Sequence, residues 1–194
     1  MSTAAVATRP GEVLADLLPA SRVRDIALVV GGAALTALSA QLSVPVPGSP
    51  VPVTGQTFAA LLVGTSLGAR RGLLSFGLYA LVGSLGAPIF QNGTSGWGGA
   101  SFGYIVGMLI AAGMVGALAR RGGDRSVLRT AGTMVLGSAV IYAVGVPWLM
   151  VSTGMSLSAA WAAGVVPFLI GDGLKAALAM GALPAAWKLV GRKS

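Results

Sequence analysis

The feature that most constrains the fold is a series of apolar runs, each about as long as a membrane-spanning helix, joined by short connections. A helix needs about 20 predominantly apolar residues to cross the bilayer core. Apolar residues make up 55% of the 194 residues and charged residues 9%, which is typical of a polytopic membrane protein and not of a soluble domain. The sequence predicts an all-α fold with six spans, at residues 25–44, 54–68, 72–88, 102–119, 127–151 and 159–189.

The length leaves room for one domain, because six spans and their turns use nearly the whole chain. We expect a single membrane domain over residues 1–194, made of a cytoplasmic segment (1–24), a six-helix body (25–189) and a short tail (190–194). Residues 11–24 carry apolar side chains at helical spacing, which predicts a short amphipathic helix lying in the membrane surface.

Lysine and arginine occupy every second connection. They precede the first span, join the second to the third and the fourth to the fifth, and follow the sixth, whereas the other three connections have none. The positive-inside rule then puts both termini in the cytoplasm. It leaves outside the glycine-rich loop 90–101 and the proline-rich segment 45–52, whose prolines favour an extended cover over the membrane edge. These orientation signals account for the net charge of +8, so nucleic-acid binding is not expected.

Missing residue types exclude several kinds of chemistry. The sequence contains no cysteine and no histidine, so disulfides and thiol-ligated metal sites are excluded and the commonest metal ligand and proton shuttle is lacking. It contains no Gly-x-x-x-x-Gly-Lys-Ser/Thr loop, so it cannot hydrolyse ATP by that chemistry. No nucleophile–base pair is present either. We therefore expect a protein that is not an enzyme and that holds neither a cofactor nor a metal.

Small residues recur four positions apart on three of the spans. Such pairs let helix backbones approach each other closely, although 30 glycines in 194 residues are enough for any one pair to arise by chance. The pairs are Ala33 and Ala37, Gly64 and Gly68, and Gly103 and Gly107.

Two ionisable residues stand alone inside the last apolar run. Asp172 and Lys175 are three positions apart, which puts a carboxylate and an ammonium on one helix face within reach of each other. A single charge at mid-bilayer depth costs about 3 kcal/mol on insertion scales, so ionisable residues there usually face a protein cavity and serve function. The residues alone leave two interpretations open: a ligand site that opens outward, or a structural salt bridge that fixes the last span.

The segment from Pro52 to Gly93 resembles the BioY family, the biotin-specific membrane subunits (S components) of energy-coupling-factor (ECF) vitamin transporters. The Gly103-Tyr104 pair and the Asp-x-x-Lys motif of the last span fall where that family has them. One segment departs from the pattern. The family usually has a Pro-Thr-Gly-Gly-Tyr-like sequence before the fourth span, and this chain has Ala-Ser-Phe-Gly-Tyr at residues 100–104.

The resemblance implies a six-helix protein of a bacterial cell membrane that binds biotin from the outside with high affinity. It also implies partners, namely a transmembrane coupling subunit and two cytoplasmic ATPases that supply the energy. In such transporters an Ala-x-x-x-Ala face of the first span meets the coupling subunit, so Ala33 and Ala37 are the expected docking residues.

The chemistry of biotin suggests a role for each charged side chain. The ureido ring has two N–H donors and a carbonyl acceptor, so we expect Asp172 to accept from an N–H and Lys175 to donate to the carbonyl. An alternative pairs Lys175 with the carboxylate of biotin. In the first arrangement the carboxylate lies toward the outer mouth, where the backbone N–H groups of residues 93–103, Ser101 and the Tyr104 hydroxyl could receive it.

Four other side chains complete the predicted site, and each has a structural alternative. Asn92 offers an amide to the pocket wall or forms an Asn-Gly turn. Gln56 is a polar contact or a satisfied helix-end group, and Tyr79 is a ligand contact or a packing residue whose hydroxyl needs a partner. Trp97 stacks on the apolar ring of the ligand or anchors its loop at the membrane interface.

A second class of function stays open beside the vitamin-binding subunit. The chain could be a gradient-driven carrier for a small vitamin-like acid that acts alone, with Asp172 as its proton site. This alternative predicts accumulation that collapses with an uncoupler in cells that lack any coupling partner.

Overall fold

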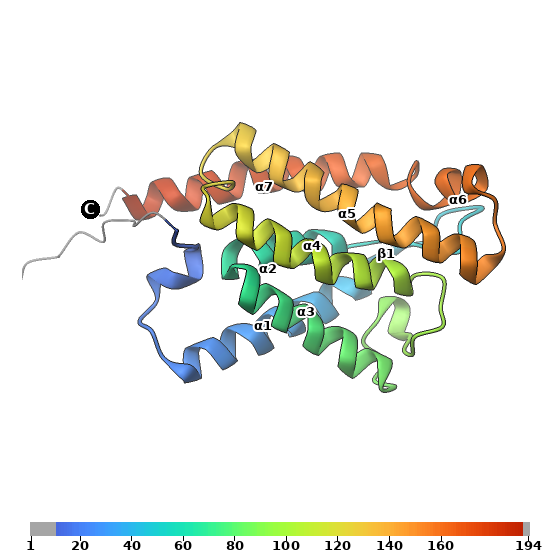
Figure 1. The fold of residues 1–194 in the computed structure, drawn as a ribbon, viewed down its shortest axis with the longest axis horizontal. Helices are drawn as coiled ribbons and strands as arrows, with labels where there is room; N and C mark the ends of the chain where they lie inside the picture. The colour runs from blue at the N-terminus through green and yellow to red at the C-terminus, as the bar shows by residue number, and fades with distance from the viewer. Residues whose placement is uncertain (1–10, 192–194) are drawn as a thin grey trace, which may run out of the picture.

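The computed structural model describes residues 11–191, and within them nearly all regular structure is helical (Figure 1). The α-helical fold expected from the sequence is confirmed, with one small addition: a two-stranded antiparallel hairpin of β1 (Ser43–Val44) and β2 (Val53–Thr54). The α-helices are α1 (Arg22–Gln41), α2 (Gln56–Leu67), α3 (Ala69–Ser84), α4 (Phe102–Arg120), α5 (Val127–Thr153), α6 (Leu157–Gly164) and α7 (Phe168–Gly191), and two short 3-10 helices are η1 (Leu14–Leu17) and η2 (Gln91–Gly93).

The helices run up and down along one axis, so the molecule has two distinct ends (Figure 1). Helix α4 lies in the middle, packed against α2, α3 and α5, while α1 packs on α3 and α2, and α7 packs on α5 and partly on α2. One end, which we call the basic end, holds η1, the α4–α5 connection and the last turn of α7. The other, the hairpin end, holds the β-hairpin, η2 and α6.

Glycine lets the central helices touch backbone to backbone. A Cβ atom added at Gly64 would lie 2.4 Å from the carbonyl oxygen of Ala112 on α4, and one added at Gly107 would lie 2.8 Å from the carbonyl oxygen of Ile141 on α5. Both distances are shorter than a side chain tolerates, so these two positions need glycine. The expectation of close helix approach at small residues therefore holds at these two crossings.

The last predicted span, residues 159–189, is not one helix. It is interrupted at residues 165–167, which form a turn between α6 and α7. Pro167 explains the break, because proline has no backbone N–H to donate and its ring clashes with the carbonyl four residues earlier. The site residues predicted on this span therefore lie near the start of α7, one turn beyond the break.

Four helices of the described chain, α1, α4, α5 and α7, are long and apolar enough to cross a membrane. Helices α2 and α3 have only 12 and 16 residues. Together with the family assignment given below, these helices indicate a multi-pass membrane protein.

The segment before α1 also differs from its prediction. Instead of an amphipathic helix over residues 11–24, the chain makes the four-residue η1 and then continues without regular structure to the cap of α1. Val13 and Ala15 are buried against Ala119 of α4, so η1 closes the basic end of the bundle. Pro19 cannot continue a helix. Burial of the apolar side chains of Val13 and Ala15 stabilises η1 in its observed position.

Ion pairs tie the basic end together. Asp16 of η1 lies 2.7 Å from Arg71 of α3 and 3.3 Å from Arg120 of α4, and Arg71 also reaches Asp25 of α1 at 3.1 Å. Partial burial by itself would raise the pKa of Asp16, but hydrogen bonds from Arg71 and from the Val13 N–H outweigh it and lower the pKa below its usual range. The network therefore holds η1, α1, α3 and α4 in one arrangement.

The end of α7 is held by a second cluster. The buried carboxylate of Asp124, in the α4–α5 connection, accepts a 2.7 Å hydrogen bond from the indole N–H of Trp187. The Arg125 guanidinium lies over the Trp187 ring, 3.4 Å from its centroid. Burial raises the pKa of Asp124 above its usual range, against the effect of the Trp187 hydrogen bond. These two contacts to Trp187 fix α7 to the body of the bundle at the basic end.

Candidate ligand-binding site

Asp172 and Lys175 lie side by side on α7, as their spacing predicts. The Lys175 Nζ atom is 3.4 Å from the Asp172 Oδ1 atom, and the two side chains are 18% and 13% exposed. The remaining surface of both side chains is covered by protein. A charged pair this close to the middle of the bundle requires further polar partners, because burying ions is costly unless their hydrogen bonds are made.

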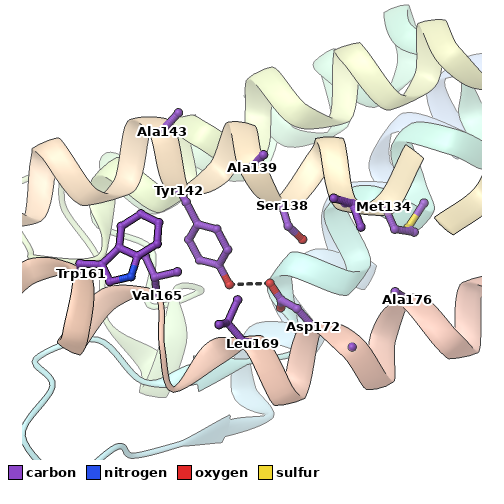
Figure 2. A pocket seen from close by; sticks show the side chains of 12 residues that line it. Met134, Ser138, Ala139, Tyr142, Ala143, Trp161, Val165, Leu169, Asp172 and Ala176 are labelled. Atoms are coloured by element: carbon purple, nitrogen blue, oxygen red, sulfur yellow. Dashed lines mark hydrogen bonds between the residues drawn. The ribbon is translucent and has the colours of Figure 1, made fainter. Parts of the chain in front are cut away.

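Those partners come from two other helices. The Tyr142 hydroxyl of α5 donates a 2.5 Å hydrogen bond to Asp172 Oδ2, and Figure 2 shows the two side chains facing each other across the α5–α7 gap. Lys175 Nζ donates to the Thr57 hydroxyl of α2 at 2.6 Å. Each ion of the pair is thereby anchored to a different neighbour, and the pair joins α2, α5 and α7.

Gln56 and Tyr79 form a second polar group beside the first. The Gln56 amide donates to the Tyr79 hydroxyl, while its oxygen accepts from the Thr54 hydroxyl of the hairpin at 3.0 Å. Tyr79 also packs edge-on against Phe90, with ring centroids 5.2 Å apart. Both predicted residues are buried and satisfy each other, and Gln56 additionally lines the small cavity described next.

A narrow cavity lies at the hairpin end between α2, α4 and α5. Its volume is about 20 Å³, which holds about one water molecule. The Oε1 atom of Gln91 is buried and has no hydrogen-bond partner among the described residues. A buried acceptor on the wall of a cavity can accept a hydrogen bond from a ligand or from a water molecule. The wall consists of Val51, Pro52, Thr54, Gln56, Thr57, Gln91, Ser101, Tyr104, Met108, Tyr142 and Phe168.

The structure brings some of the predicted residues to this cavity and leaves others outside. Ser101 and Tyr104 are buried in its wall. The Tyr104 hydroxyl donates to the Gly164 carbonyl at 3.0 Å, and its ring stacks on Phe168 with centroids 6.2 Å apart. Asn92 is exposed on the η2 turn with a φ of 55°. Trp97 is 69% exposed, and neither of these two lines the cavity.

Three side chains that the sequence did not single out belong to the site: Thr57, Gln91 and Tyr142. Thr57 follows Gln56 directly, and Tyr142 is a lone hydroxyl in a long apolar run. Gln91 precedes Asn92 directly and lines the cavity, whereas Asn92, whose backbone is left-handed, does not. The signals were present, but each depended on knowing which helix face turns inward.

Asp172 does not line this small cavity, although its hydrogen-bond partner Tyr142 does, but it borders a larger space. A groove of about 580 Å³ runs between α5, α6 and α7 (Figure 2). Its walls are mostly apolar, with Ser138, Tyr142 and Asp172 as the exceptions. Tyr142, which holds the Asp172 carboxylate, therefore borders both the small cavity and the open apolar groove.

The predicted docking residues lie mainly inside the bundle. Ala33 is 8% exposed and belongs to the core, and Ala37 packs against that core. The small residues that α1 exposes are Ala27, Gly31 and Ala34. No group of three or more potential metal-ligating side chains occurs within residues 11–191.

A model of the BioY family matches residues 10–192. The chain belongs to the BioY family. It is 35% identical to a probable biotin transporter BioY of Pyrococcus horikoshii, over 82% of this chain and 93% of that protein. It is 33% identical to the biotin transporter BioY2 of Lactococcus lactis subsp. cremoris, over 81% of this chain and 87% of that protein.

The fold also matches a solved structure. The S component for biotin from an ECF-type ABC transporter superimposes with a TM-score of 0.77 at 21% identity, over 88% of this chain and 95% of that one. The match shows a shared fold. The family expected from the sequence is thus confirmed, and so is the expectation that the chain is not an enzyme, because the relatives that define the family are transporters.

Proposed function

We propose that this chain is a biotin-binding S component, which captures biotin between α2, α5 and α7 and delivers it inward with an ECF coupling subunit and ATPases. Membership of the BioY family, two relatives named as biotin transporters and the S-component fold support this function. The observation that carries it is the Asp172–Lys175 pair, held by hydroxyls from two other helices beside a polar cavity.

The pair suits the ureido head of biotin. A carboxylate accepts N–H bonds and an ammonium donates to a carbonyl, and the two lie 3.4 Å apart, which matches an N–H next to a C=O on one small ring. Binding of the biotin carboxylate by Lys175 ranks second, since Asp172 beside it would repel a second anion. We expect Gln91, whose buried oxygen has no partner among residues 11–191, to accept from the other ureido N–H.

Binding requires the cavity to open. Room for about one water molecule cannot hold biotin, so part of the wall moves when the ligand enters. The hairpin and the segment around Gln91 and Ser101 form that part of the wall and lie outside the α-helices. Loops of this kind have fewer packing contacts than helices and open at lower cost. The predicted roles of Ser101 and Tyr104 toward the carboxylate belong to the opened state.

The same proposal includes the topology. All described arginines that stand in connections lie at the basic end, which favours a cytoplasmic position for that end and for both termini. Six spans, with the short α2 and α3 as two of them, make one membrane domain in the bacterial cell membrane. If α1 docks on the coupling subunit, the exposed Ala27, Gly31 and Ala34 provide the contact surface and Ala33 supports it from within.

Isothermal titration of the detergent-solubilised protein with biotin tests the function. The parent should bind one biotin per chain. Asp172→Asn and Lys175→Ala should each weaken binding at least roughly 30-fold, because truncating one member of a buried charge pair costs about 2 kcal/mol or more. Lys188→Ala, at the exposed far end of the same helix, is the matched control and should bind like the parent.

One result of this titration would contradict the proposed function. A folded parent, free of carried-over biotin, that gives no heat would overturn the biotin assignment. The gradient-driven carrier would then take first place, and uptake by cells that lack a coupling subunit, measured with and without an uncoupler, would decide it.

A further inference from the structure

A large space on the surface of the described chain shares no residue with the proposed biotin site. It is a groove of about 810 Å³ between α1 and α3, beginning at the basic end. These two helices lie side by side in Figure 1. Most of the groove is lined by aliphatic side chains, among them Ile26, Val30 and Leu74, each of which is more than half exposed.

Charge is confined to one end of this groove. Three arginines, Arg22, Arg70 and Arg71, and one aspartate, Asp25, line it there. Arg71 and Asp25 are paired with each other, and Arg71 also binds Asp16. The side chains of Arg22 and Arg70 are exposed, and their guanidinium groups have no hydrogen bond or ion pair with any residue of the described chain. The groove thus presents two uncompensated guanidinium groups above an apolar channel.

The length of the channel matches one bilayer leaflet. From Arg70 to Leu81 the groove follows twelve residues of α3, a rise of about 16 Å. Half of a hydrocarbon core of about 30 Å is about 15 Å. An amphiphile with a charged head at the two arginines would therefore place its chain along the groove and end near the bilayer midplane.

We propose that the α1–α3 groove is a binding site for one anionic phospholipid of the cytoplasmic leaflet. The phosphate of its head group binds Arg22 and Arg70, and an acyl chain lies over Val30, Leu74 and Gly77. Basic pockets between membrane helices on the cytoplasmic side are suited to such lipids, because the guanidinium fork pairs with phosphate and the aliphatic walls accept the chain. The choice of leaflet rests on the topology proposed above.

The site is separate from the expected protein contact. Ile26 and Val30 face the groove, whereas the exposed small residues Ala27 and Gly31 lie roughly 100° further around α1 and the exposed Ala34 lies roughly 40° beyond Val30. A lipid in the groove would thus fill the space between α1 and α3 while the small-residue face of α1 stays free. Bound there, it would brace the α1–α3 pair beside a partner that docks on α1.

Native mass spectrometry of the full chain in detergent tests the proposal. Dioleoyl phosphatidylglycerol and dioleoyl phosphatidylcholine are titrated separately, and the bound fraction of each is measured. The parent should bind phosphatidylglycerol more tightly. An Arg22→Gln/Arg70→Gln double variant should weaken phosphatidylglycerol binding roughly 30-fold, which corresponds to about 2 kcal/mol at 1.4 kcal/mol per tenfold change, and should leave phosphatidylcholine nearly unchanged.

Two further variants separate specific binding in the groove from general attraction to positive charge. Arg121→Gln/Arg129→Gln removes the same charge from exposed positions in the α4–α5 connection and at the start of α5, away from the groove, and should bind phosphatidylglycerol like the parent. Gly77→Phe fills the groove, since nothing lies within 4 Å of a Cβ added there, and should weaken both lipids roughly tenfold or more while every charge remains.

Several results would overturn the lipid site. Equal binding of the two lipids by the parent would do so, as would an equal loss in the two double variants, which would indicate diffuse attraction to the whole basic end. If Gly77→Phe abolished co-purification of the coupling subunit and left bound lipid unchanged, the groove would be a protein-docking surface instead. Biotin titration of the same samples keeps the two proposals apart, because normal biotin binding with no lipid preference would sink this one alone.

Discussion

Two groups of acidic and basic side chains, one at the basic end and one in the proposed site on α7, differ in what surrounds them. At the basic end Arg71 contacts Asp16 and Asp25, and Asp16 also meets Arg120 and the Val13 N–H. In the proposed site Asp172 and Lys175 contact each other and two hydroxyls, those of Tyr142 and Thr57. The first cluster is an ion network that satisfies itself, and the second stands beside a cavity.

The difference lies in the kind of partner. An arginine fork bound to two carboxylates has little capacity left, and breaking it exposes charge. A hydroxyl can rotate to donate or accept, so Tyr142 and Thr57 can release or redirect their bonds when a ligand arrives. The unpartnered Gln91 oxygen nearby adds an acceptor that the protein alone leaves unused. The arginine network therefore favours a stabilising role, whereas the hydroxyl-bonded pair favours an exchangeable, ligand-binding one.

The largest effect is expected from removing the Tyr142 hydroxyl. Tyr142→Phe keeps the ring in place but takes away the hydrogen bond to Asp172, a bond to a charged group worth about 1.5–3 kcal/mol. Biotin affinity measured by titration should fall roughly 10- to 100-fold, with little change in thermal stability. Ser138→Ala, one turn earlier on α5 and facing the same lateral groove, is the control and should bind within threefold of the parent. If Tyr142→Phe bound biotin with unchanged affinity, the hydrogen bond from Tyr142 would not be needed to orient Asp172 toward the ligand.

The sequence could locate the pair but not its surroundings. Asp172 and Lys175 are visible because ionisable residues in an apolar run are costly and rare, and their mutual contact follows from helical spacing alone. Tyr142 and Thr57 are only weakly polar, so they occur in membrane helices for many reasons. Their part in the site depends on the rotation of α5 and α2 about their axes, which is set by contacts between helices.

The same limit applies to the fold. Hydropathy describes residues 159–189 as one apolar run, yet the missing N–H of Pro167 divides it into α6 and α7. Helical spacing over residues 11–24 predicted a surface helix, whereas the burial of Val13 against the bundle decided the structure. Composition predicted the class of fold and the close approach at Gly64 and Gly107, while the ends of helices were decided by contacts between segments distant in sequence.

Replacing Arg71 should separate stability from binding. Arg71→Ala removes the contacts to Asp16 and Asp25, and thermal unfolding in detergent should show a loss of about 1–2 kcal/mol at neutral pH, as expected for a partly shielded network. Biotin affinity should stay within threefold of the parent. Arg70→Ala, the exposed neighbour with no partner in the described chain, should have almost no effect on stability. Similar losses for the two variants would contradict the role given to the network.

The stability loss should also depend on pH in a defined direction. The pKa of Asp16 is lower in the folded protein than its ordinary value of 3.8, so its contribution is complete above that value and disappears as the pH falls through the folded pKa. The difference in stability between the parent and Arg71→Ala should therefore be constant near neutral pH and shrink below about pH 4. A difference that grew on acidification would assign the effect to another group.

The smallest effect tests two neighbouring residues of η2. Gln91→Ala removes the acceptor that lines the cavity, and biotin affinity should fall about three- to tenfold, as expected for a neutral hydrogen bond of about 1 kcal/mol. Asn92→Gly changes the amide predicted from the sequence, but its side chain is exposed and its φ of 55° suits glycine. We expect Asn92→Gly to bind like the parent. If Asn92→Gly weakened binding and Gln91→Ala did not, Asn92 would be the residue that contacts biotin. The cavity would then open by a movement of η2 that turns the Asn92 side chain inward.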